Sequence, residues 1–300
     1  MNKCFFYFNA KVGEFYIMKV IQLDKEIIDY GVQLIDPVKQ WVETKGEGIK
    51  IGILDTGIDY KHEDIKHAIH GGVNFTSSNK GDYMDRCGHG TFCAGIIAAE
   101  MNGFGIVGIA PHAQLFAVKV LNDRSQGTLN WLLQGIDWCI RNKMDIISMS
   151  LGFEKDYPKL HNAVRYAYNE GINMVAAVGN NKFEPDAEYP ARYNEVISVT
   201  AIDSVKHIAR FATAGPKVEV SAPGVNIKST YLRNQYAIGS GTSFSTPLIS
   251  GSIALIQSTA LKKMGRKMTQ EELKEFIYSH CDDLGAPGRD NNYGYGMFHF

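Results

Sequence analysis

The sequence predicts an α/β fold: a doubly wound, mostly parallel sheet with helices on both faces, arranged in three layers. Several short stretches rich in β-branched residues are apolar almost without interruption, which is typical of strands covered on both faces of a parallel sheet. Stretches with a helical pattern alternate with them, and such alternation favours right-handed crossovers.

The predicted elements follow one another from residue 49 onward. Strands are expected at 49–54, 113–121, 145–151, 173–178, 196–202 and 218–221. Helices are expected at 89–101, 128–143, 157–170, 243–264 and 270–280. Asp55 ends the first strand, while His89 and Ser243 open helices. Because functional groups gather at the carboxyl ends of parallel strands, we expect these three side chains to face one crevice.

Composition limits the classes of partner. Of the 300 residues, 45% are hydrophobic, which is enough for one large core and a single main domain. The formal net charge is −1 and the basic residues are scattered, so we expect no nucleic-acid partner. No apolar run approaches the roughly 18 residues of a membrane span, so we expect no membrane partner either. The oligomeric state, including a homo-oligomer, stays open.

The cysteines and the N-terminus favour a cytoplasmic location. The five cysteines are odd in number and lack the spacing of a disulfide framework, which suits thiols that stay reduced. The apolar run after Lys3 ends at Asn9, short of the roughly 7 to 15 residues in the core of an export signal. Secretion by a route that the sequence does not reveal is the alternative.

Three short motifs supply a carboxylate, an imidazole and a hydroxyl beside small residues, at Asp55, His89 and Ser243. A serine attacks only when a base removes its proton, and a buried carboxylate fixes that base. Simpler interpretations are a turn residue for Asp55, a helix N-cap for Ser243, and a helix start or a zinc ligand with Cys87 and Cys93 for His89. That cysteine spacing matches no common zinc site. The three motifs together favour a nucleophilic serine.

The order Asp, His, Ser along the chain is that of the subtilisins. From about residue 30 to residue 296 the chain resembles subtilisin-type serine proteases, with further matching stretches at 118–121, 146–152 and 178–180. The resemblance implies a serine endopeptidase that hydrolyses polypeptides through Asp55, His89 and Ser243 by way of an acyl-enzyme. It also implies that the side chain of Asn180 and the backbone N–H of Ser243 stabilise the oxyanion.

Few residues precede the matching region. Extracellular subtilisins usually carry a signal and a long pro-domain, whereas intracellular subtilisins carry a short extension, as this chain does. The resemblance therefore implies that residues 1–29 form an N-terminal extension that blocks the site until it is removed, followed by a catalytic domain at residues 30–300. A frayed terminus without such a role is the alternative.

In related proteases the substrate lies as an extra antiparallel strand between two edge segments. The matching segments, small or containing glycine as close approach demands, are Ser125, Gln126 and Gly127 on one side and Ser150, Leu151 and Gly152 on the other. By the resemblance, Glu188 stands at the floor of the pocket for the side chain before the scissile bond. A desolvated carboxylate there favours a basic residue. The alternative is that Glu188 points to solvent.

The resemblance also implies a structural calcium ion, because subtilisins bind calcium at surface loops through oxygen ligands. The matching ligands are the side chains of Asp64 and Asn102, with Glu26 as an N-terminal ligand, and the backbone carbonyls of Glu100, Phe104 and Ile106. The alternative is that Asn102 and Gly103 only form a tight turn.

Several positions depart from the usual subtilisin pattern: Phe92 stands where histidine is common, and after Ser243 the residues Phe244, Ser245 and Leu248 replace the usual Met, Ala and His. The catalytic residues are kept, whereas the packing behind them is rebuilt. Two functions therefore compete with a general endopeptidase. One is a dedicated precursor-maturation protease, which a charged pocket at Glu188 would suit. The other is a protease-like binding module with weak or lost turnover.

Overall fold

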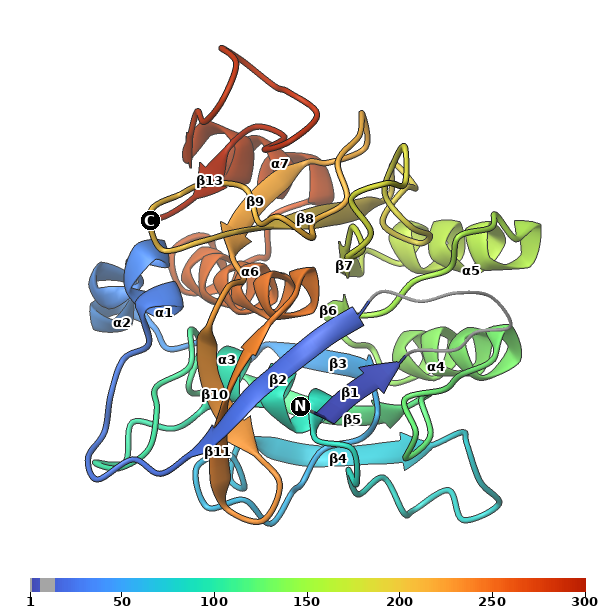
Figure 1. The fold of residues 1–300 in the computed structure, drawn as a ribbon, viewed down its shortest axis with the longest axis vertical. Helices are drawn as coiled ribbons and strands as arrows, with labels where there is room; N and C mark the ends of the chain where they lie inside the picture. The colour runs from blue at the N-terminus through green and yellow to red at the C-terminus, as the bar shows by residue number, and fades with distance from the viewer. Residues whose placement is uncertain (1, 6–13) are drawn as a thin grey trace.

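In a computed structural model of the protein, the backbone is described for residues 2–5 and 14–300, and the side chains from residue 19 onward. The predicted α/β fold is confirmed, because a nine-stranded, mostly parallel sheet lies between layers of helices (Figure 1). Within the expected N-terminal extension, residues 1 and 6–13 lie outside the described residues.

The large sheet positions the functional residues. Its strand order is β12-β13-β9-β8-β7-β6-β3-β5-β4, and neighbouring strands are parallel except for β12 and β13. The strands are β3 (Lys50–Asp55), β4 (Ile69–Asn74), β5 (Gln114–Lys119), β6 (Ile146–Met149), β7 (Asn173–Ala177), β8 (Val196–Ile202), β9 (Val220–Pro223), β12 (Cys281–Asp282) and β13 (Met297–Phe298). Strand β8 is buried along its whole length, as expected for a strand covered on both faces.

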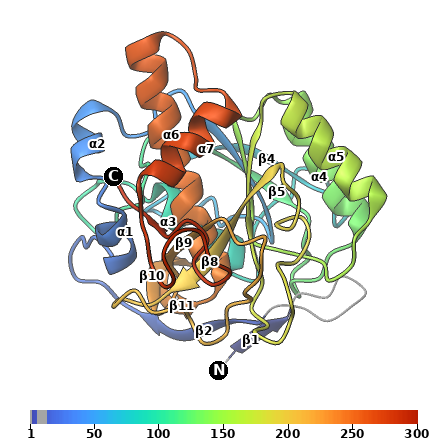
Figure 2. The ribbon, with the colours of Figure 1, turned by 90° about the horizontal axis from the view of Figure 1, so that it is seen from above.

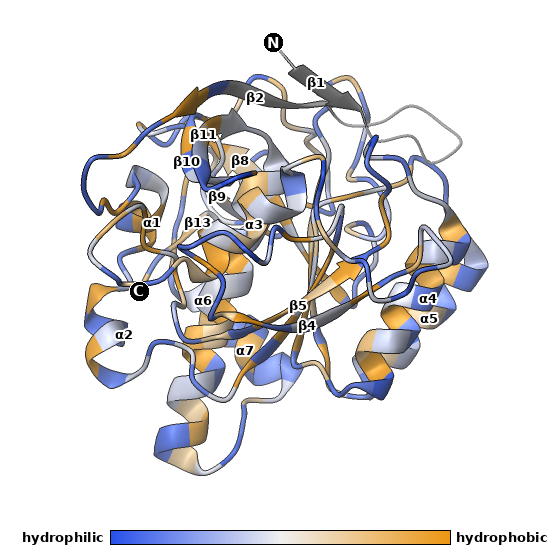
Figure 3. Ribbon diagram, turned by 90° about the horizontal axis from the view of Figure 1, so that it is seen from below, coloured by the Kyte–Doolittle hydropathy of each residue, from blue (hydrophilic) through white to orange (hydrophobic). Residues whose placement is uncertain are grey.

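Helices cover both faces of this sheet. Figure 2 shows α4 (Leu129–Arg141) and α5 (Pro158–Asn169) together on one side, with α6 (Thr242–Met264) on the other. On the α6 side lie also α3 (His89–Ala98), α1 (Tyr30–Ile35), α2 (Val38–Glu43) and α7 (Gln270–Ser279). Helix α6 is buried along most of its length, whereas α4 and α5 carry hydrophilic and hydrophobic residues in turn (Figure 3), as surface helices do.

A second, four-stranded sheet has the order β1-β2-β11-β10. It consists of β1 (Asn2–Phe5), β2 (Glu14–Ile21), β10 (Ile227–Tyr231) and β11 (Gln235–Ser240), and all its neighbours are antiparallel. Strand β11 leads directly into α6. Strand β2 runs beside β11 (Figure 1), and near its N-terminal end Tyr16 pairs with Ser240. The small sheet therefore joins the N-terminal part of the chain to the strand before α6.

Candidate active site

Three elements bring the predicted triad to one edge of the large sheet. Asp55 is the last residue of β3, His89 is the first residue of α3, and Ser243 is the second residue of α6. Glycines permit this meeting, since a Cβ at Gly90 would overlap the carbonyl oxygen of Gly57 and would lie 3.1 Å from Cβ of Asp55. Asp55 lies at the carboxyl end of β3, where the strand pattern predicted the site.

The carboxylate and the imidazole form a buried pair. Nδ1 of His89 lies 2.8 Å from Oδ1 and 2.9 Å from Oδ2 of Asp55, and both residues have 0% exposure. The N–H of Thr56 also donates to Oδ1 of Asp55 at 2.7 Å. This geometry fixes the ring through Nδ1 and turns Nε2 to the opposite side, which is the tautomer that a general base needs.

Asp85, which sequence reasoning missed, organises the loop before His89. Its carboxylate accepts the N–H groups of Cys87, Gly88 and Thr91 at 2.8, 2.9 and 3.0 Å, and the hydroxyl of Thr91 at 2.7 Å. Burial raises the pKa of Asp85 despite these bonds. Gly88 turns with φ +103° directly before α3. The sequence shows an aspartate four positions before His89, but an isolated aspartate is more typical of a turn and does not by itself indicate this role.

The nucleophile candidate faces the segment after β6. The hydroxyl of Ser243 donates to the carbonyl oxygen of Ser150 at 3.4 Å, and the hydroxyl of Ser150 donates back to the carbonyl oxygen of Ser243 at 2.7 Å. These two bonds join the start of α6 to the segment after β6. The ring of the adjacent Phe244 lies 5.6 Å from the ring of His89.

Two of the departures from the subtilisin pattern pack against each other. The rings of Phe92 on α3 and Phe244 on α6 lie 4.2 Å apart, and both side chains have 0% exposure. Cys93 lies nearby, with its thiol 3.6 Å from the hydroxyl of Ser150 and from the carbonyl oxygen of Ser243. The rebuilt packing is therefore one aromatic contact that joins the two helices carrying His89 and Ser243.

Asn180 lies beside the start of α6. Its Oδ1 accepts the N–H and the hydroxyl of Thr242, both at 2.9 Å. Because Oδ1 is held there, the NH2 group is turned away from Thr242. The N–H of Ser243 belongs to the first turn of α6, where backbone donors have no partner within the helix. Asn180 and Ser243, the two predicted sources of oxyanion donors, are thus linked through Thr242, which bonds to Asn180 and directly precedes Ser243.

One predicted groove segment contacts the loop before His89, and the other contacts Ser243. Ser125, with φ +57°, is buried, and its hydroxyl lies 2.8 Å from the thiol of Cys87. Gly127 pairs with Leu121, while Gln126 is half-buried. On the other side Ser150 and Leu151 are buried and Gly152 is half-buried. Cys87, an alternative zinc ligand from the sequence, therefore contacts a groove residue instead.

Glu188 points inward, between the two segments that carry Gly152 and Gly179. Only 8% of the residue is exposed. A Cβ at Gly179 would lie 2.9 Å from Oε1, and a Cβ at Gly152 would overlap Oε2. Burial, with smaller contributions from the charges of Glu154 and Glu184, raises the pKa of Glu188 to about 8. The alternative in which Glu188 points to solvent is therefore wrong.

The side chains of Asp64 and Glu26 contact the loop at 100–106, which contains the other predicted calcium ligands. Asn102 Nδ2 donates to Asp64 Oδ1 at 3.0 Å, and the N–H of Ile106 donates to Oδ2 at 2.9 Å. Oε1 of Glu26 accepts the N–H groups of Asn102 and Gly103 at 2.9 and 2.7 Å. Burial raises the pKa of Asp64 to about 6.

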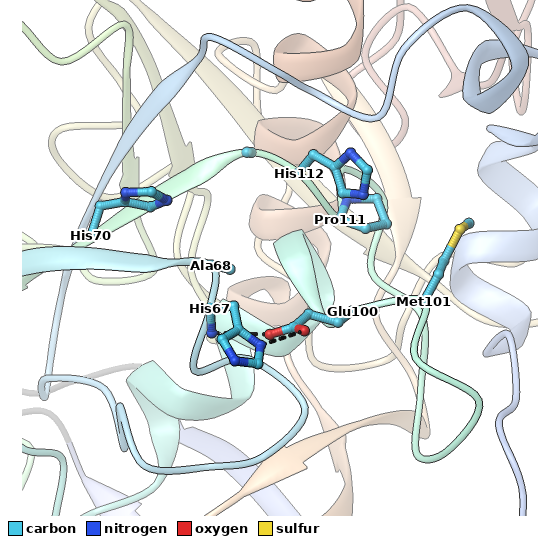
Figure 4. A pocket seen from close by; sticks show the side chains of 8 residues that line it. His67, Ala68, His70, Glu100, Met101, Pro111 and His112 are labelled. Atoms are coloured by element: carbon cyan, nitrogen blue, oxygen red, sulfur yellow. Dashed lines mark hydrogen bonds and ion pairs between the residues drawn. The ribbon is translucent and has the colours of Figure 1, made fainter.

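The side chain of Glu100 faces a separate hollow (Figure 4). It accepts the backbone N–H of His67 at 3.0 Å and lies 2.9 Å from Nδ1 of the same residue. Among the described residues, the one group of three His, Cys, Asp or Glu side chains close enough to share an ion is Asp55, His89 and Cys93. The remaining histidines around this hollow, His70 and His112, lie apart from His67 (Figure 4).

The comparisons with known proteins agree with this geometry. A model of the subtilase family matches residues 46–296. The minor extracellular protease Epr of Bacillus subtilis strain 168 is 43% identical over 292 residues, which cover 92% of this chain but 43% of that protein. The intracellular serine protease of Paenibacillus polymyxa is 41% identical over 284 residues, or 91% of this chain and 87% of that protein. The major intracellular serine protease of Bacillus subtilis strain 168 is 38% identical over 260 residues, or 84% and 82%.

The chain thus spans less than half the length of one extracellular relative and most of the length of two intracellular ones. In the described part of the chain, every helix falls short of the length or apolar character that crossing a membrane requires.

Proposed function

This chain belongs to the subtilase family of serine endopeptidases, and on that premise we propose that it hydrolyses peptide bonds in polypeptides through Asp55, His89 and Ser243. The proposal is supported above all by the buried pair of Asp55 and His89 at 2.8 Å, formed at the edge where α6 begins. In the proposed reaction His89 removes the proton of Ser243, Ser243 attacks the peptide carbonyl, and Asp55 stabilises the imidazolium.

The remaining catalytic roles fall to hydrogen-bond donors. We assign the oxyanion to the side-chain NH2 of Asn180 and the N–H of Ser243. The bonds from Thr242 to Oδ1 support this assignment, since they fix the amide before any substrate arrives. Loss of one such donor costs about 100- to 1000-fold in kcat, a magnitude established with subtilisin itself.

A fluorophosphonate probe tests the activity directly. We expect it to label the protein at Ser243, and Ser243→Ala to abolish the labelling. Ser245→Ala is the matched control, because the hydroxyl of Ser245 bonds to the carbonyls of Ala222 and Pro223 behind the site. A folded protein that resists the probe would favour the competing function of a protease-like binding module.

We propose further that Glu188 gives a preference for Arg or Lys before the scissile bond. The carboxylate contacts Gly152 of the groove, and a partly desolvated charge favours an opposite charge. Peptides that differ only in Arg, Leu or Glu at this position are to be compared at pH 9, where Glu188 is ionised. Equal rates for Arg and Leu would remove the preference, and with it the argument for a dedicated maturation protease.

We propose that calcium binds the loop that begins at Glu100. Within the described residues, the carbonyl oxygens of Glu100, Phe104 and Ile106 accept no hydrogen bond, and the buried carboxylate of Asp64 has no cationic partner. Carbonyl and carboxylate oxygens are the ligands that Ca²⁺ prefers. The side-chain oxygens of Asp64 and Asn102 would complete the set, and the ion would cross-link the loop to the body.

We propose that residues 1–29 act as an inhibitory extension and residues 30–300 as the catalytic domain. Strand β2 pairs with β11 as far as Tyr16 opposite Ser240, three positions before Ser243, and it runs antiparallel to β11. The described N-terminal end of β2 therefore lies beside the end of β11 that leads to the nucleophile. A protein that begins at residue 30 should hydrolyse casein faster than the full chain, and equal rates would refute inhibition.

We propose a cytoplasmic location because two of the relatives are named intracellular proteases. The extracellular relative keeps secretion as the alternative. Cell fractionation with an antibody distinguishes the two.

A further inference from the structure

The carboxyl group of Glu188 is an unusual floor for a binding pocket, because nothing in the described structure neutralises it. The two neighbouring segments approach it with glycines, at Gly152 and Gly179. No described side chain or backbone group donates a hydrogen bond to Oε1 or Oε2, although the backbone of Glu188 is paired with Val178 and Arg192. A buried carboxylate without a donor or a cation favours its neutral form.

The charges around Glu188 act in the same direction. From the segment after Gly152 the contributing charge is Glu154, and from the loop at 181–187 it is Glu184. The segment at 177–180 contains no charged residue. The basic side chain of the following turn, Arg192, is engaged elsewhere, since its Nε donates to the carbonyl oxygen of Ala187 at 2.7 Å and lies 3.5 Å from Asp186.

We propose that Glu188 makes the cleavage specificity of this protein depend on pH, because its protonated carboxyl accepts neutral side chains before the scissile bond and its ionised form selects Arg and Lys. The inference rests on the proposed preference of this pocket for Arg and Lys. It adds that protonation of Glu188 turns this preference off. No covalent step is involved: the proton of Glu188 passes to solvent as the cationic side chain enters.

The switch lies between neutral and alkaline pH. The pKa of Glu188 is raised from 4.5 to about 8, so at pH 6 nearly all free enzyme carries a neutral carboxyl and at pH 9 most carries a charged one. The pH dependence of kcat/KM reports the free enzyme. Selection for Arg should therefore increase as the pH rises through about 8.

The experiment uses the full active protein and two peptides that differ only in Arg or citrulline before the scissile bond. Citrulline keeps the shape of arginine without its charge, so an effect of pH that is common to both peptides cancels in the ratio of their rates. We expect the ratio of kcat/KM, Arg over citrulline, to increase on the order of 100-fold between pH 6 and pH 9. In Glu188→Gln the ratio should be flat.

Two further variants keep the test sharp if Glu188→Gln folds poorly. Glu154→Gln and Glu184→Gln each remove one neighbouring charge, so the midpoint of the ratio should shift to lower pH. A ratio above one that stays flat with pH overturns this inference and leaves the basic preference standing. A ratio near one throughout overturns both. If the protein hydrolyses neither peptide, the proposed activity itself is overturned.

Discussion

At the scale of single residues, the sequence indicated the proposed catalytic side chains more clearly than the side chains that position them. Asp55 and His89 stand in short glycine-bounded motifs and meet as expected, at 2.8 Å. Asp85 escaped notice because its function comes from four donors that only the folded loop collects. The present orientation of the Ser243 hydroxyl likewise depends on Ser150, which is distant in sequence.

The buried carboxyl of Glu188 makes a prediction about stability. Its folded pKa, about 8, exceeds its ordinary value of 4.5, so the ionised form destabilises the fold, and stability is lost as the pH rises from about 4.5 through about 8. Gln cannot ionise. Glu188→Gln should therefore be more stable than the parent by up to about 5 kcal/mol at pH 9 and nearly equal to it at pH 4.

Urea unfolding at both pH values measures this difference, with Ser243→Ala in both proteins to prevent self-digestion. A gain in stability that is the same at pH 4 and pH 9 would contradict the assigned titration.

At the scale of elements, continuous apolar runs predicted the central strands of the large sheet. Strands whose apolar pattern is interrupted or very short were not predicted. Strand β4 was missed because Gly71 and Gly72 break its pattern and its register with β5 shifts after Ile69. The hairpin of β10 and β11 was missed because its turn uses Arg233 and Asn234, at φ +61° and +58°, where Asn-Gly is the usual signal. Strands of two residues, such as β12, leave no readable pattern.

The contact between α3 and α6 carries a second prediction. The rings of Phe92 and Phe244 pack against each other. Replacing either with Ala leaves a cavity and should lower the free energy of unfolding by about 3 to 5 kcal/mol. The double variant should lose less than the sum, by about 0.5 to 1.5 kcal/mol. Because Phe244 also borders His89, kcat should decrease with stability.

Denaturant unfolding and peptide hydrolysis of the four proteins measure these effects. Tyr166→Ala is the control, because Tyr166 lies on the outer helix α5 and is 55% exposed. Strictly additive losses would mean that the two rings do not support each other.

At the scale of the whole molecule, alternation of strands and helices was enough to predict the layered fold. The small sheet was beyond reach, because β2 pairs with β11 from the opposite end of the chain. No local pattern encodes such a partner. The same holds for the groove, whose two sides were inferred by resemblance and whose tight closure around Glu188 became visible only in three dimensions.

Calcium provides the prediction at this scale. If the loop from Glu100 to Ile106 holds an ion through Asp64, a chelator should lower the melting temperature, and added Ca²⁺ should restore it. In Asp64→Asn the melting temperature should no longer respond to either. Glu63→Gln is a matched control, since Glu63 is exposed and bonds to Lys66. An unchanged parent protein in chelator would contradict the site.

Helix α6 threads the middle of the molecule and contacts β6, β7, β8 and β9 as well as α3. A chain still emerging from the ribosome contains Asp55 and His89 before it contains Ser243 of α6, so the proposed triad stays incomplete until this helix has been made.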